Sequence, residues 1–394
     1  MFKIRTYNRI SVNGLERFSR EKYEVGSDIA HPDAMLLRSH KLHDEALPGT
    51  LKAIARAGAG VNNVPVQQCN EQGIVVFNTP GANANAVKEL VMCALLLGSR
   101  GISGGMNYVQ TLTHIHDAGE MSALLEQEKK NFAGNELYGK KLGVIGLGAI
   151  GSMVAETALA LGMEVLGFDP ALSVEAAWRL PNQVQRMENM QSLLSKSDYI
   201  SLHVPAIPAT HHMLNADTLS YVKPGAVLLN FARDAIVDAH AIVASLDSER
   251  GLSQYICDFP EPCLLGRNDV LAMPHIGAST KEAEENCAVM AANQLIDFLE
   301  NGNIKNSVNF PVIAMERDPG TVRITFANSN VSGVLGHVLS VLADHEVNVA
   351  DMVNKSRGEL AYNIIDVEDT PSDAVVSAIQ AVEHVVSVRV LPGN

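Results

Sequence analysis

Three charged or titratable side chains follow apolar segments in the middle of the chain, and their chemistry is complementary. Arg233 follows residues 226–230, Glu261 lies between two prolines, and His275 follows the segment that begins at Val270. A guanidinium can clamp a carboxylate through two parallel hydrogen bonds, and an imidazole can take up and return a proton. If Glu261 contacts the second ring nitrogen of His275, it fixes the tautomer and raises the imidazole pKa. The set suits hydride chemistry on a hydroxy acid, where a hydroxyl proton moves beside a bound carboxylate.

The second chemical signal is a glycine loop with the spacing G-x-G-x-x-G at the end of an apolar segment. Gly146 allows a tight turn, Gly148 lets the backbone approach a pyrophosphate, and Gly151 lets the next helix pack closely on the sheet. The first amides of that helix, including those of Ala149 and Ile150, face the phosphates. The spacing therefore predicts a dinucleotide site.

Asp169 ends the next apolar segment, residues 163–168. A carboxylate at this place accepts hydrogen bonds from both hydroxyls of the adenosine ribose and repels a 2′-phosphate, so NAD is favoured over NADP. Glycine loops also occur as plain strand-to-helix turns. Here strand, loop, helix, strand and acid follow in the order of one βαβ unit, which favours the dinucleotide.

The surrounding segments predict an α/β fold with a parallel sheet. A helix is expected from Ser152 to about Leu161, and residues 35–98 alternate short apolar runs with Gly, Asn and Pro turns. Residues 279–282 form a capping box that opens a long helix, which Asn301-Gly302 closes. The further parallel strands are expected at residues 199–205, 226–230 and 270–274.

A proline-marked connection at residues 311–319 separates these segments from a different pattern. Beyond it, residues 321–394 follow the order strand, helix, strand, strand, helix, strand, which is ferredoxin-like. This part carries no cluster of catalytic residues. Binding, regulation or assembly is its expected role.

Length and composition limit the function classes. The 394 residues predict two or three domains, and the net charge of −14 argues against nucleic acid or an anionic membrane as main partner. Five cysteines without a C-x-x-C pair, and no signal peptide, favour the cytoplasm. The cluster His114, His116 and Asp117 lies in a polar loop without a further ligand, so no metal site is expected.

Several of these segments resemble the signatures of the D-isomer-specific 2-hydroxyacid dehydrogenases, and the resemblance covers nearly the whole chain. The segments concerned are residues 230–238, 261–262 and 274–280. Within that superfamily, the N-terminal half resembles the members that use NAD to oxidise 3-phospho-D-glycerate to 3-phosphohydroxypyruvate, the first step of L-serine biosynthesis. The segments that carry this second likeness are residues 37–39, 56–64 and 78–80.

The resemblance implies a Rossmann-type NAD domain inserted in a flavodoxin-like substrate domain, followed by a C-terminal ferredoxin-like βαββαβ ACT domain. The implied boundaries are residues 1–96 and 288–318 for the substrate domain, 97–287 for the NAD domain and 319–394 for the ACT domain. It also implies that Arg233, Glu261 and His275 are the catalytic set, in agreement with their chemistry. Beyond the glycine loop and Asp169, the implied cofactor contacts are His203, Val204, Pro205, Phe231, Ala232, Asp258, Gly277 and Ala278.

For the substrate, the resemblance implies that the loop of Gly58, Ala59, Gly60 and Val61 offers backbone amides to the carboxylate, with Asn83 beside it. Arg233 and His275 also contact the substrate. Basic residues for the phosphate must come from outside the NAD domain, and the candidates are Arg38, Lys41 and Arg56. Many relatives have R-S-R where this chain has Arg38-Ser39-His40-Lys41, so Lys41 is the expected replacement for the second arginine.

Some relatives bind serine at the interface of their ACT domains, and the matching positions here are Asn328, Asn330 and Asn348. An L-serine effector acting between the subunits of a homo-oligomer, a dimer or a tetramer, is therefore expected. The alternative is a dimerisation module without an effector.

Two other functions remain open at this stage. Another D-2-hydroxyacid dehydrogenase, such as a glyoxylate or hydroxypyruvate reductase, would need neither the basic residues nor the ACT domain. A non-enzymatic NAD-sensing protein, like the corepressors that share this fold, would need no turnover. A substrate panel separates the three.

Overall fold

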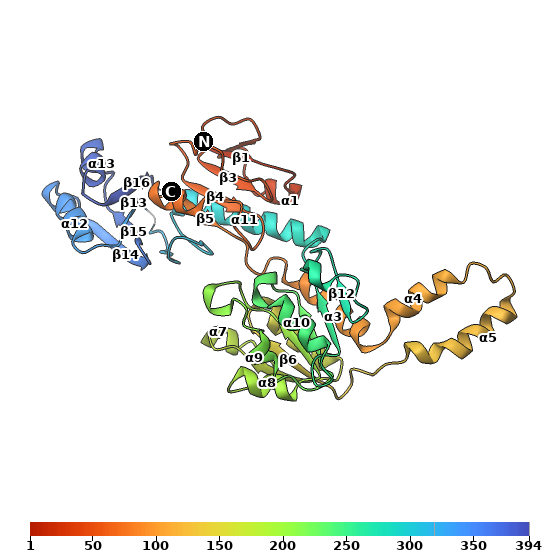
Figure 1. The fold of residues 1–394 in the computed structure, drawn as a ribbon. Helices are drawn as coiled ribbons and strands as arrows, with labels where there is room; N and C mark the ends of the chain where they lie inside the picture. The colour runs from red at the N-terminus through yellow and green to blue at the C-terminus, as the bar shows by residue number, and fades with distance from the viewer. Residues whose placement is uncertain (319, 394) are drawn as a thin grey trace. The chain divides into compact units, whose positions relative to one another are not determined.

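The structure is a computed structural model that describes residues 1–318 and 320–393. Its backbone forms two compact units (Figure 1). Unit 1 consists of Met1–Asn83 and Lys281–Asn394, and unit 2 of Ala84–Thr280.

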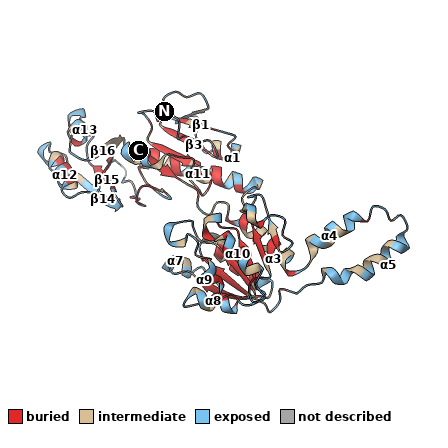
Figure 2. Ribbon diagram, in the orientation of Figure 1, coloured by how far each residue is buried: buried red, intermediate tan, exposed pale blue. Residues whose placement is uncertain are grey.

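Unit 2 is built on a seven-stranded sheet with the order β12-β11-β10-β9-β6-β7-β8, in which neighbouring strands are parallel. The central strands are apolar at almost every position and are buried on both faces, as parallel strands require (Figure 2). The strands are β6 (Lys141–Ile145), β7 (Glu164–Phe168), β8 (Gln185–Arg186), β9 (Tyr199–Leu202), β10 (Val227–Asn230), β11 (Gln254–Cys257) and β12 (Val270–Ala272).

The strand order of unit 2 reverses between β6 and β9, the first strand and the fourth strand of this unit. Ligands of open parallel sheets bind beyond the carboxyl ends of the strands at such a reversal. The helices of this unit are α3 (Ala84–Ser99), α4 (Ile102–Thr111), α5 (Ala118–Glu128), α6 (Ala149–Ala160), α7 (Val174–Ala177), α8 (Met190–Lys196), α9 (Ala216–Leu219) and α10 (Ala239–Leu246). Short 3-10 helices are η1 (Lys129–Phe132), η2 (Pro208–Thr210), η3 (Asp234–Ile236) and η4 (Pro262–Leu264).

Unit 1 contains a five-stranded parallel sheet with the order β2-β1-β3-β4-β5, the flavodoxin-like order. The strands are β1 (Phe2–Thr6), β2 (Tyr23–Gly26), β3 (Ala34–Leu37), β4 (Ala53–Arg56) and β5 (Val75–Phe77), with helices α1 (Val12–Leu15) and α2 (Val66–Glu71) between them. The long helix α11 (Lys281–Asn301) returns the chain to this sheet and packs on α1, β3 and β4. Its alanines and Phe298 complete the core of the unit.

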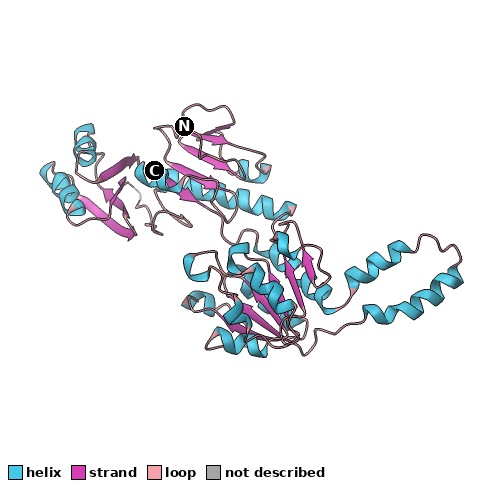
Figure 3. Cartoon of the chain, in the orientation of Figure 1, coloured by secondary structure: helices cyan, strands magenta, loops and turns pink. Residues whose placement is uncertain are grey.

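The C-terminal part of unit 1 is a four-stranded antiparallel sheet with the order β14-β15-β13-β16 (Figure 3). Two helices complete it, so the expected α/β class and the C-terminal βαββαβ order are confirmed. The elements are β13 (Val322–Ser329), α12 (Val334–Asp344), β14 (Val349–Arg357), β15 (Leu360–Val367), α13 (Asp373–Gln380) and β16 (Val385–Leu391).

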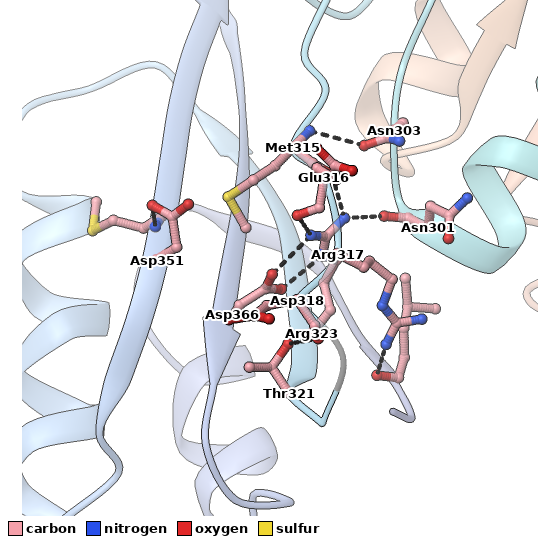
Figure 4. A network of polar contacts seen from close by, with 12 residues as sticks. Asn301, Asn303, Met315, Glu316, Arg317, Asp318, Thr321, Arg323, Asp351 and Asp366 are labelled. Carbon is pink, nitrogen blue, oxygen red and sulfur yellow. Dashed lines mark hydrogen bonds and ion pairs between the residues drawn. The ribbon is translucent and has the colours of Figure 1, made fainter. Parts of the chain in front are cut away.

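A buried arginine ties this sheet to the segment before it (Figure 4). Arg323 on β13 is 0% exposed and forms two hydrogen bonds with the Asp366 carboxylate, from Nε at 2.7 Å and from Nη2 at 2.8 Å. Its other N–H groups donate to the carbonyl oxygens of Asn301, Met315 and Glu316 at 2.8–3.0 Å. All five donors of the guanidinium therefore have acceptors, which is the condition for a stable buried charge.

The unit boundaries lie at residues 83/84 and 280/281, whereas the sequence suggested 96/97 and 287/288. Contacts explain the difference, because α3 packs on α6, β10 and β11 of unit 2, whereas α11 packs on α1, β3 and β4 of unit 1. The expected connection at residues 311–319 ends at Pro319, which lies outside the described residues. In the part of the chain that the structure describes, no helix is long and apolar enough to cross a membrane.

Candidate active site

The loop after β10 presents Arg233 at the carboxyl edge of the unit 2 sheet. Asn230, the last residue of β10, is fully buried and shapes this loop. Its Nδ2 donates to the Arg233 carbonyl at 2.9 Å, and its Oδ1 accepts from the Ala232 amide at 3.1 Å. The guanidinium itself donates from Nη1 to the Ala232 carbonyl at 2.6 Å. One side chain therefore fixes the backbone on both sides of the expected carboxylate-binding residue.

His275 lies in the loop after β12, at the same edge of the sheet, and has a left-handed backbone with φ 57°. This conformation is uncommon for residues other than glycine, although histidine is among those that adopt it more often, and local contacts must hold it in place. The buried Asp258 carboxylate accepts from the amides of Ile276 at 2.8 Å and Gly277 at 2.7 Å. Asp258 therefore anchors the loop that presents the exposed imidazole.

Phe259, for which no sequence motif predicts a role, lies between Arg233 and His275. The His275 ring packs on the Phe259 ring with centroids 4.5 Å apart, and the Arg233 guanidinium lies 5.7 Å from the same ring. An aromatic face attracts a cation without neutralising it. The pair is thus held together by an apolar spacer that leaves its polar atoms for a ligand.

Glu261 follows Phe259 by two residues and is the N-cap residue just before η4. Burial is the main cause that raises the pKa of the Tyr255 hydroxyl and of the Cys257 thiol, and the Glu261 charge adds to both shifts, so Glu261 lies near the carboxyl end of β11. Among the described residues, no hydrogen bond or ion pair joins Glu261 to His275. The His275 ring packs against Phe259 at an interplanar angle of 50°, which leaves its ring nitrogens available, and the expected contact with Glu261 is not formed in this structure.

The glycine loop has the geometry that a pyrophosphate needs. Gly146 turns the chain with φ 89°, and a Cβ at Gly151 would lie 1.9 Å from the Gly146 carbonyl oxygen. Gly148 is the N-cap of α6, no side chain caps that helix, and a Cβ at Gly148 would meet no atom within 4 Å. The first amides of α6, those of Ala149 and Ile150 among them, have no acceptor within the helix and border open space.

We expect Gly151→Ala to disrupt this loop, because the added methyl group collides with backbone rather than with a movable side chain. The expected costs are about 1–3 kcal/mol of stability and at least a tenfold loss of NAD affinity, about 1.4 kcal/mol. Urea unfolding and fluorescence titration with NADH measure the two effects. Gly148→Ala is the matched control, which should leave stability unchanged while it weakens binding. Wild-type affinity in Gly151→Ala would rule out the assigned role of the loop.

Asp169 ends β7 next to the glycine loop. Its carboxylate accepts from the Leu147 amide at 2.8 Å and the Ala171 amide at 2.9 Å, which fixes its position beside the loop. A cavity of about 950 Å³ opens at Asp169, and its lining includes Leu172 and Trp178. A site of this size, with an acid on one side and apolar groups on the other, matches an adenosine moiety.

His203 lies behind the glycine loop rather than in open space. Its backbone carbonyl would be 2.5 Å from a Cβ at Gly146, and its ring Nε2 is 2.8 Å from the Ser201 hydroxyl. Its Nδ1 is buried and has no partner in the described part of the chain. Burial lowers the pKa of His203 to about 3. A neutral imidazole here supports the loop and brings no charge to a phosphate.

The His203 pKa predicts a pH dependence of stability. The unfolded chain protonates this histidine near pH 6.5, whereas the folded chain resists protonation down to about pH 3. Its contribution is therefore complete above about pH 6.5 and falls as the pH decreases below that value. We expect the wild type to lose more stability than His203→Gln between pH 7 and about pH 5, measured by urea unfolding. His240→Gln, an exposed control, should follow the wild type; equal losses in all three proteins would refute the assignment.

The remaining expected cofactor residues lie in the same row of loops. Val204 and Pro205 follow β9, Phe231 and Ala232 follow β10, and Gly277 and Ala278 follow His275. Phe231 and Ala232 are buried, and a Cβ at Gly277 would lie 2.9 Å from Asp258. Asp258 is also among the cofactor contacts that the resemblance implies. In the structure its two oxygens accept the amides of Ile276 and Gly277, and Asp258 thereby positions the His275 loop.

In unit 1, the expected carboxylate-binding loop follows β4. Gly58 has φ 152°, and the Arg56 guanidinium folds over it so closely that a Cβ would lie 1.8 Å from Nη1. The Gly58 amide donates to the Arg56 carbonyl at 2.9 Å. Among the described residues, no acceptor is found for the three next amides, which belong to Ala59, Gly60 and Val61. Asn83, the last residue before α3, is partly buried.

The basic residues around this loop differ in their surroundings. Arg38 forms an ion pair of 2.7 Å with Glu284 on α11, and both side chains are well exposed. Arg56 donates from Nε to the Arg38 carbonyl at 3.0 Å, so it supports the Arg38 backbone. Lys41 is exposed. His40, at the position of the missing arginine, pairs with Glu45 at 2.5 Å and stacks on Tyr7.

The three asparagines expected to bind an effector are not together within one chain. Asn328 pairs with Ala361 at one end of the C-terminal sheet, and Asn348 precedes β14 at the other end, where Val349 pairs with Val367. Asn328 is buried and accepts from Asn363 at 2.8 Å. Asn330 donates to the Gly358 carbonyl. A ligand that touches Asn328 and Asn348 together must bridge two chains.

The residues of unit 2 fit a nicotinamide dinucleotide. The first amides of α6 match the pyrophosphate, and the Asp169 carboxylate matches the ribose. The cavity beside Asp169 matches the adenine. Gly151 leaves no room for any side chain, and Gly148 borders the space where the phosphates bind.

Comparison with known proteins agrees with this geometry. Residues 105–277 match the family described as D-isomer specific 2-hydroxyacid dehydrogenase, NAD binding domain. The chain is 31% identical over 357 residues to D-3-phosphoglycerate dehydrogenase of Haemophilus influenzae, covering 88% of this chain and 82% of that protein. It is 34% identical over 348 residues to the Escherichia coli enzyme of the same name, covering 85% of this chain and 79% of that one.

Among solved structures, NAD⁺-bound 3-phosphoglycerate dehydrogenase of Entamoeba histolytica is similar with a TM-score of 0.61 and 26% identity. The alignment covers 79% of this chain and 99% of that one. The resemblance noted in the sequence is therefore confirmed. The chain belongs to the D-isomer specific 2-hydroxyacid dehydrogenase family.

Proposed function

We propose that this protein is an NAD-dependent dehydrogenase that oxidises 3-phospho-D-glycerate to 3-phosphohydroxypyruvate, the first step of L-serine biosynthesis. The observation that carries the proposal is the arrangement of Arg233, Phe259 and His275 at the carboxyl edge of the sheet that also bears the glycine loop. The relatives named D-3-phosphoglycerate dehydrogenase support the choice of substrate.

NAD, when bound, accepts a hydride from the carbon that bears the substrate hydroxyl. Arg233 binds the substrate carboxylate through its guanidinium, which the Asn230 hydrogen bonds and the Phe259 ring hold in place. The exposed His275 imidazole takes the hydroxyl proton as the hydride leaves. Asp258 sets the position of that imidazole through the amides of Ile276 and Gly277. Glu261, three residues after Asp258, would complete the catalytic set by contacting His275 when cofactor and substrate are bound.

Residues of unit 1 recognise the rest of the substrate in this proposal. The amides of Ala59, Gly60 and Val61 bind carboxylate oxygen, as successive backbone amides do for anions. When the substrate binds, Arg38 releases Glu284 and pairs with the phosphate. A phosphate dianion attracts the guanidinium more strongly than an exposed carboxylate does. Arg56 supports Arg38, and Lys41 adds a second positive charge.

A substrate panel tests the proposal. Purified protein is assayed for NADH formation from 3-phosphoglycerate, with a trap for the keto product, and for NADH oxidation by glyoxylate and hydroxypyruvate. Turnover of the phosphorylated substrate is the expected result. Reduction of glyoxylate or hydroxypyruvate alone would assign the sister reductases, and NAD binding without any turnover would assign a sensing protein.

We further propose that the enzyme is a homo-oligomer in the cytoplasm. The helices α4 and α5 form an arm of unit 2 (Figure 1); neither helix contains a buried residue, and Met106 and Val109 of α4 expose apolar side chains. A second copy would cover such an arm. The five cysteines are free thiols, as expected in a reducing compartment.

L-serine is the proposed effector of the C-terminal domain, bound between two chains by Asn330 and Asn348, with Asn328 in support. The separation of Asn328 and Asn348 at opposite ends of one sheet agrees with a site shared by two subunits. Serine should lower the rate of NADH formation and raise the melting temperature. Absence of both effects would leave the domain with an assembly role.

A further inference from the structure

A cavity of about 540 Å³ lies inside unit 1, between the parallel sheet and the C-terminal sheet. On one side it is lined by residues that precede the parallel strands, including Asp33, Lys52 and Gly73. On the other side it is lined by residues of β13, β15 and β16. The residues assigned above to the substrate follow the parallel strands, so the cavity is at the opposite edge of that sheet.

The walls of this cavity are fixed by close packing. Phe298 of α11 and Tyr362 of β15 belong to one hydrophobic core. A Cβ at Gly73 would lie 2.8 Å from the Ser387 hydroxyl of β16, so the two sheets approach closely there. Arg389 of β16 donates to the Leu299 carbonyl at 2.9 Å and to the Phe298 carbonyl at 3.3 Å. The volume falls within the range of small-molecule sites.

Positive charge collects in the lining of this cavity, although the chain as a whole carries a charge of −14. Lys3, Lys52 and Arg389 line it together with a single carboxylate, Asp33, which pairs with Lys52. In the described residues, no carboxylate lies within ion-pair distance of Arg389. Burial lowers the pKa of Arg389, and its guanidinium is held by the carbonyl groups of Phe298 and Leu299 and by the Phe298 ring at 4.5 Å rather than by a carboxylate.

Two buried hydroxyl groups also line the cavity. Tyr362 is 3% exposed and Thr325 is 1% exposed. The two hydroxyls lie close enough to interact with each other, but no hydrogen bond of good geometry joins them to one another or to another group in the described part of the chain. Buried polar groups without partners are rare in folded proteins and cost free energy. A ligand with polar atoms would satisfy them.

A structural explanation accounts for part of this arrangement. Arg389 caps the carbonyl end of α11, where a cation is favoured by the helix dipole. That contact requires neither the exposed Lys3 nor the poorly paired hydroxyls of Tyr362 and Thr325. These three groups surround the same cavity as the guanidinium and point to an occupant.

We propose that this cavity binds a small organic anion, with its carboxylate or phosphate group on Arg389 and Lys3 and a hydroxyl or amino group on Tyr362 and Thr325. Such a ligand contacts both sheets of unit 1 at once. Its binding therefore stabilises the C-terminal sheet on the parallel sheet, which gives the protein a second anion site besides that for the substrate.

Isothermal titration calorimetry of the full chain tests the proposal, with inorganic phosphate and succinate as probes. Tyr362→Phe removes only the poorly paired hydroxyl and should unfold at or above the wild-type temperature, while its affinity for the probe falls about tenfold. Lys3→Gln should weaken binding to a similar degree. The matched controls Tyr138→Phe and Lys130→Gln change exposed residues of unit 2 and should bind as the wild type does.

Arg38→Gln separates this cavity from the substrate site, because it should retain the binding that Tyr362→Phe loses. Binding of phosphate alone assigns a phosphorylated ligand, and binding of succinate alone assigns a carboxylate. The proposal is overturned if neither probe binds, if Tyr362→Phe and Lys3→Gln bind as the wild type does, or if only Arg38→Gln loses binding. Since heat is measured and not turnover, the outcome does not depend on the proposed reaction.

Discussion

His275→Asn should lower kcat by about 10²–10⁴-fold, the usual contribution of a positioned general acid or base. Asparagine suits this position because it tolerates the left-handed backbone that His275 adopts at φ 57°. The substitution therefore removes the imidazole and leaves the loop on Asp258 intact. Steady-state kinetics with 3-phosphoglycerate measures the effect, and NADH fluorescence titration should show unchanged cofactor affinity.

His240→Asn is the matched control for this prediction, since it removes an exposed histidine of α10 in the same unit. Its kinetics should equal those of the wild type. If His275→Asn keeps more than about a tenth of wild-type kcat, another group moves the proton and the assigned role is wrong. If it loses NADH affinity instead, His275 belongs to the cofactor site.

Arg323→Met should destabilise the C-terminal sheet by about 3–5 kcal/mol, because it leaves the buried Asp366 carboxylate without its partner. The carbonyl groups of Asn301, Met315 and Glu316 lose their donors in the same change (Figure 4). Hydrogen exchange is the suitable measurement, since a chain of several domains need not unfold in one step. Faster exchange is expected in β13, β15 and residues 301–316.

Arg267→Met is the control for the buried arginine, because Arg267 also bonds two carboxylates, those of Asp247 and Asp269, but at the surface of unit 2. Surface pairs of this kind contribute little. Exchange should therefore remain close to wild type in Arg267→Met. Equal protection of β13 in both variants would mean that the buried pair does not hold the C-terminal sheet.

Much of the fold follows from short-range patterns in the sequence. The glycine spacing at residues 146–151 requires a strand before it and a helix after it, and both are present as β6 and α6. Apolar runs that end in Asn230 or Leu202 form buried parallel strands. Because side chains with chemistry follow such runs directly, their place at one edge of the sheet could be expected from the sequence alone.

Other features depend on contacts between distant segments and could not be predicted in this way. Phe259 contacts both Arg233 and His275, but the three residues lie in three different loops. The Asp258 carboxylate likewise accepts a hydrogen bond from an amide of the His275 loop, which is distant from it in sequence. Arg323 is a charge within an otherwise buried strand, and its partners lie outside that strand. The unit boundary at residue 83 also depends on how α3 packs.

The dependence of turnover on the substrate phosphate tests the central claim most directly. The measurement is kcat/KM for NADH formation from 3-phospho-D-glycerate and from D-glycerate, with wild type and Arg38→Gln. The proposed function predicts a preference of at least about 100-fold for the phosphorylated substrate, equal to about 2.7 kcal/mol, and a loss of most of it in Arg38→Gln. Equal use of both substrates by the wild type would contradict the proposed function and leave a dehydrogenase for unphosphorylated hydroxy acids.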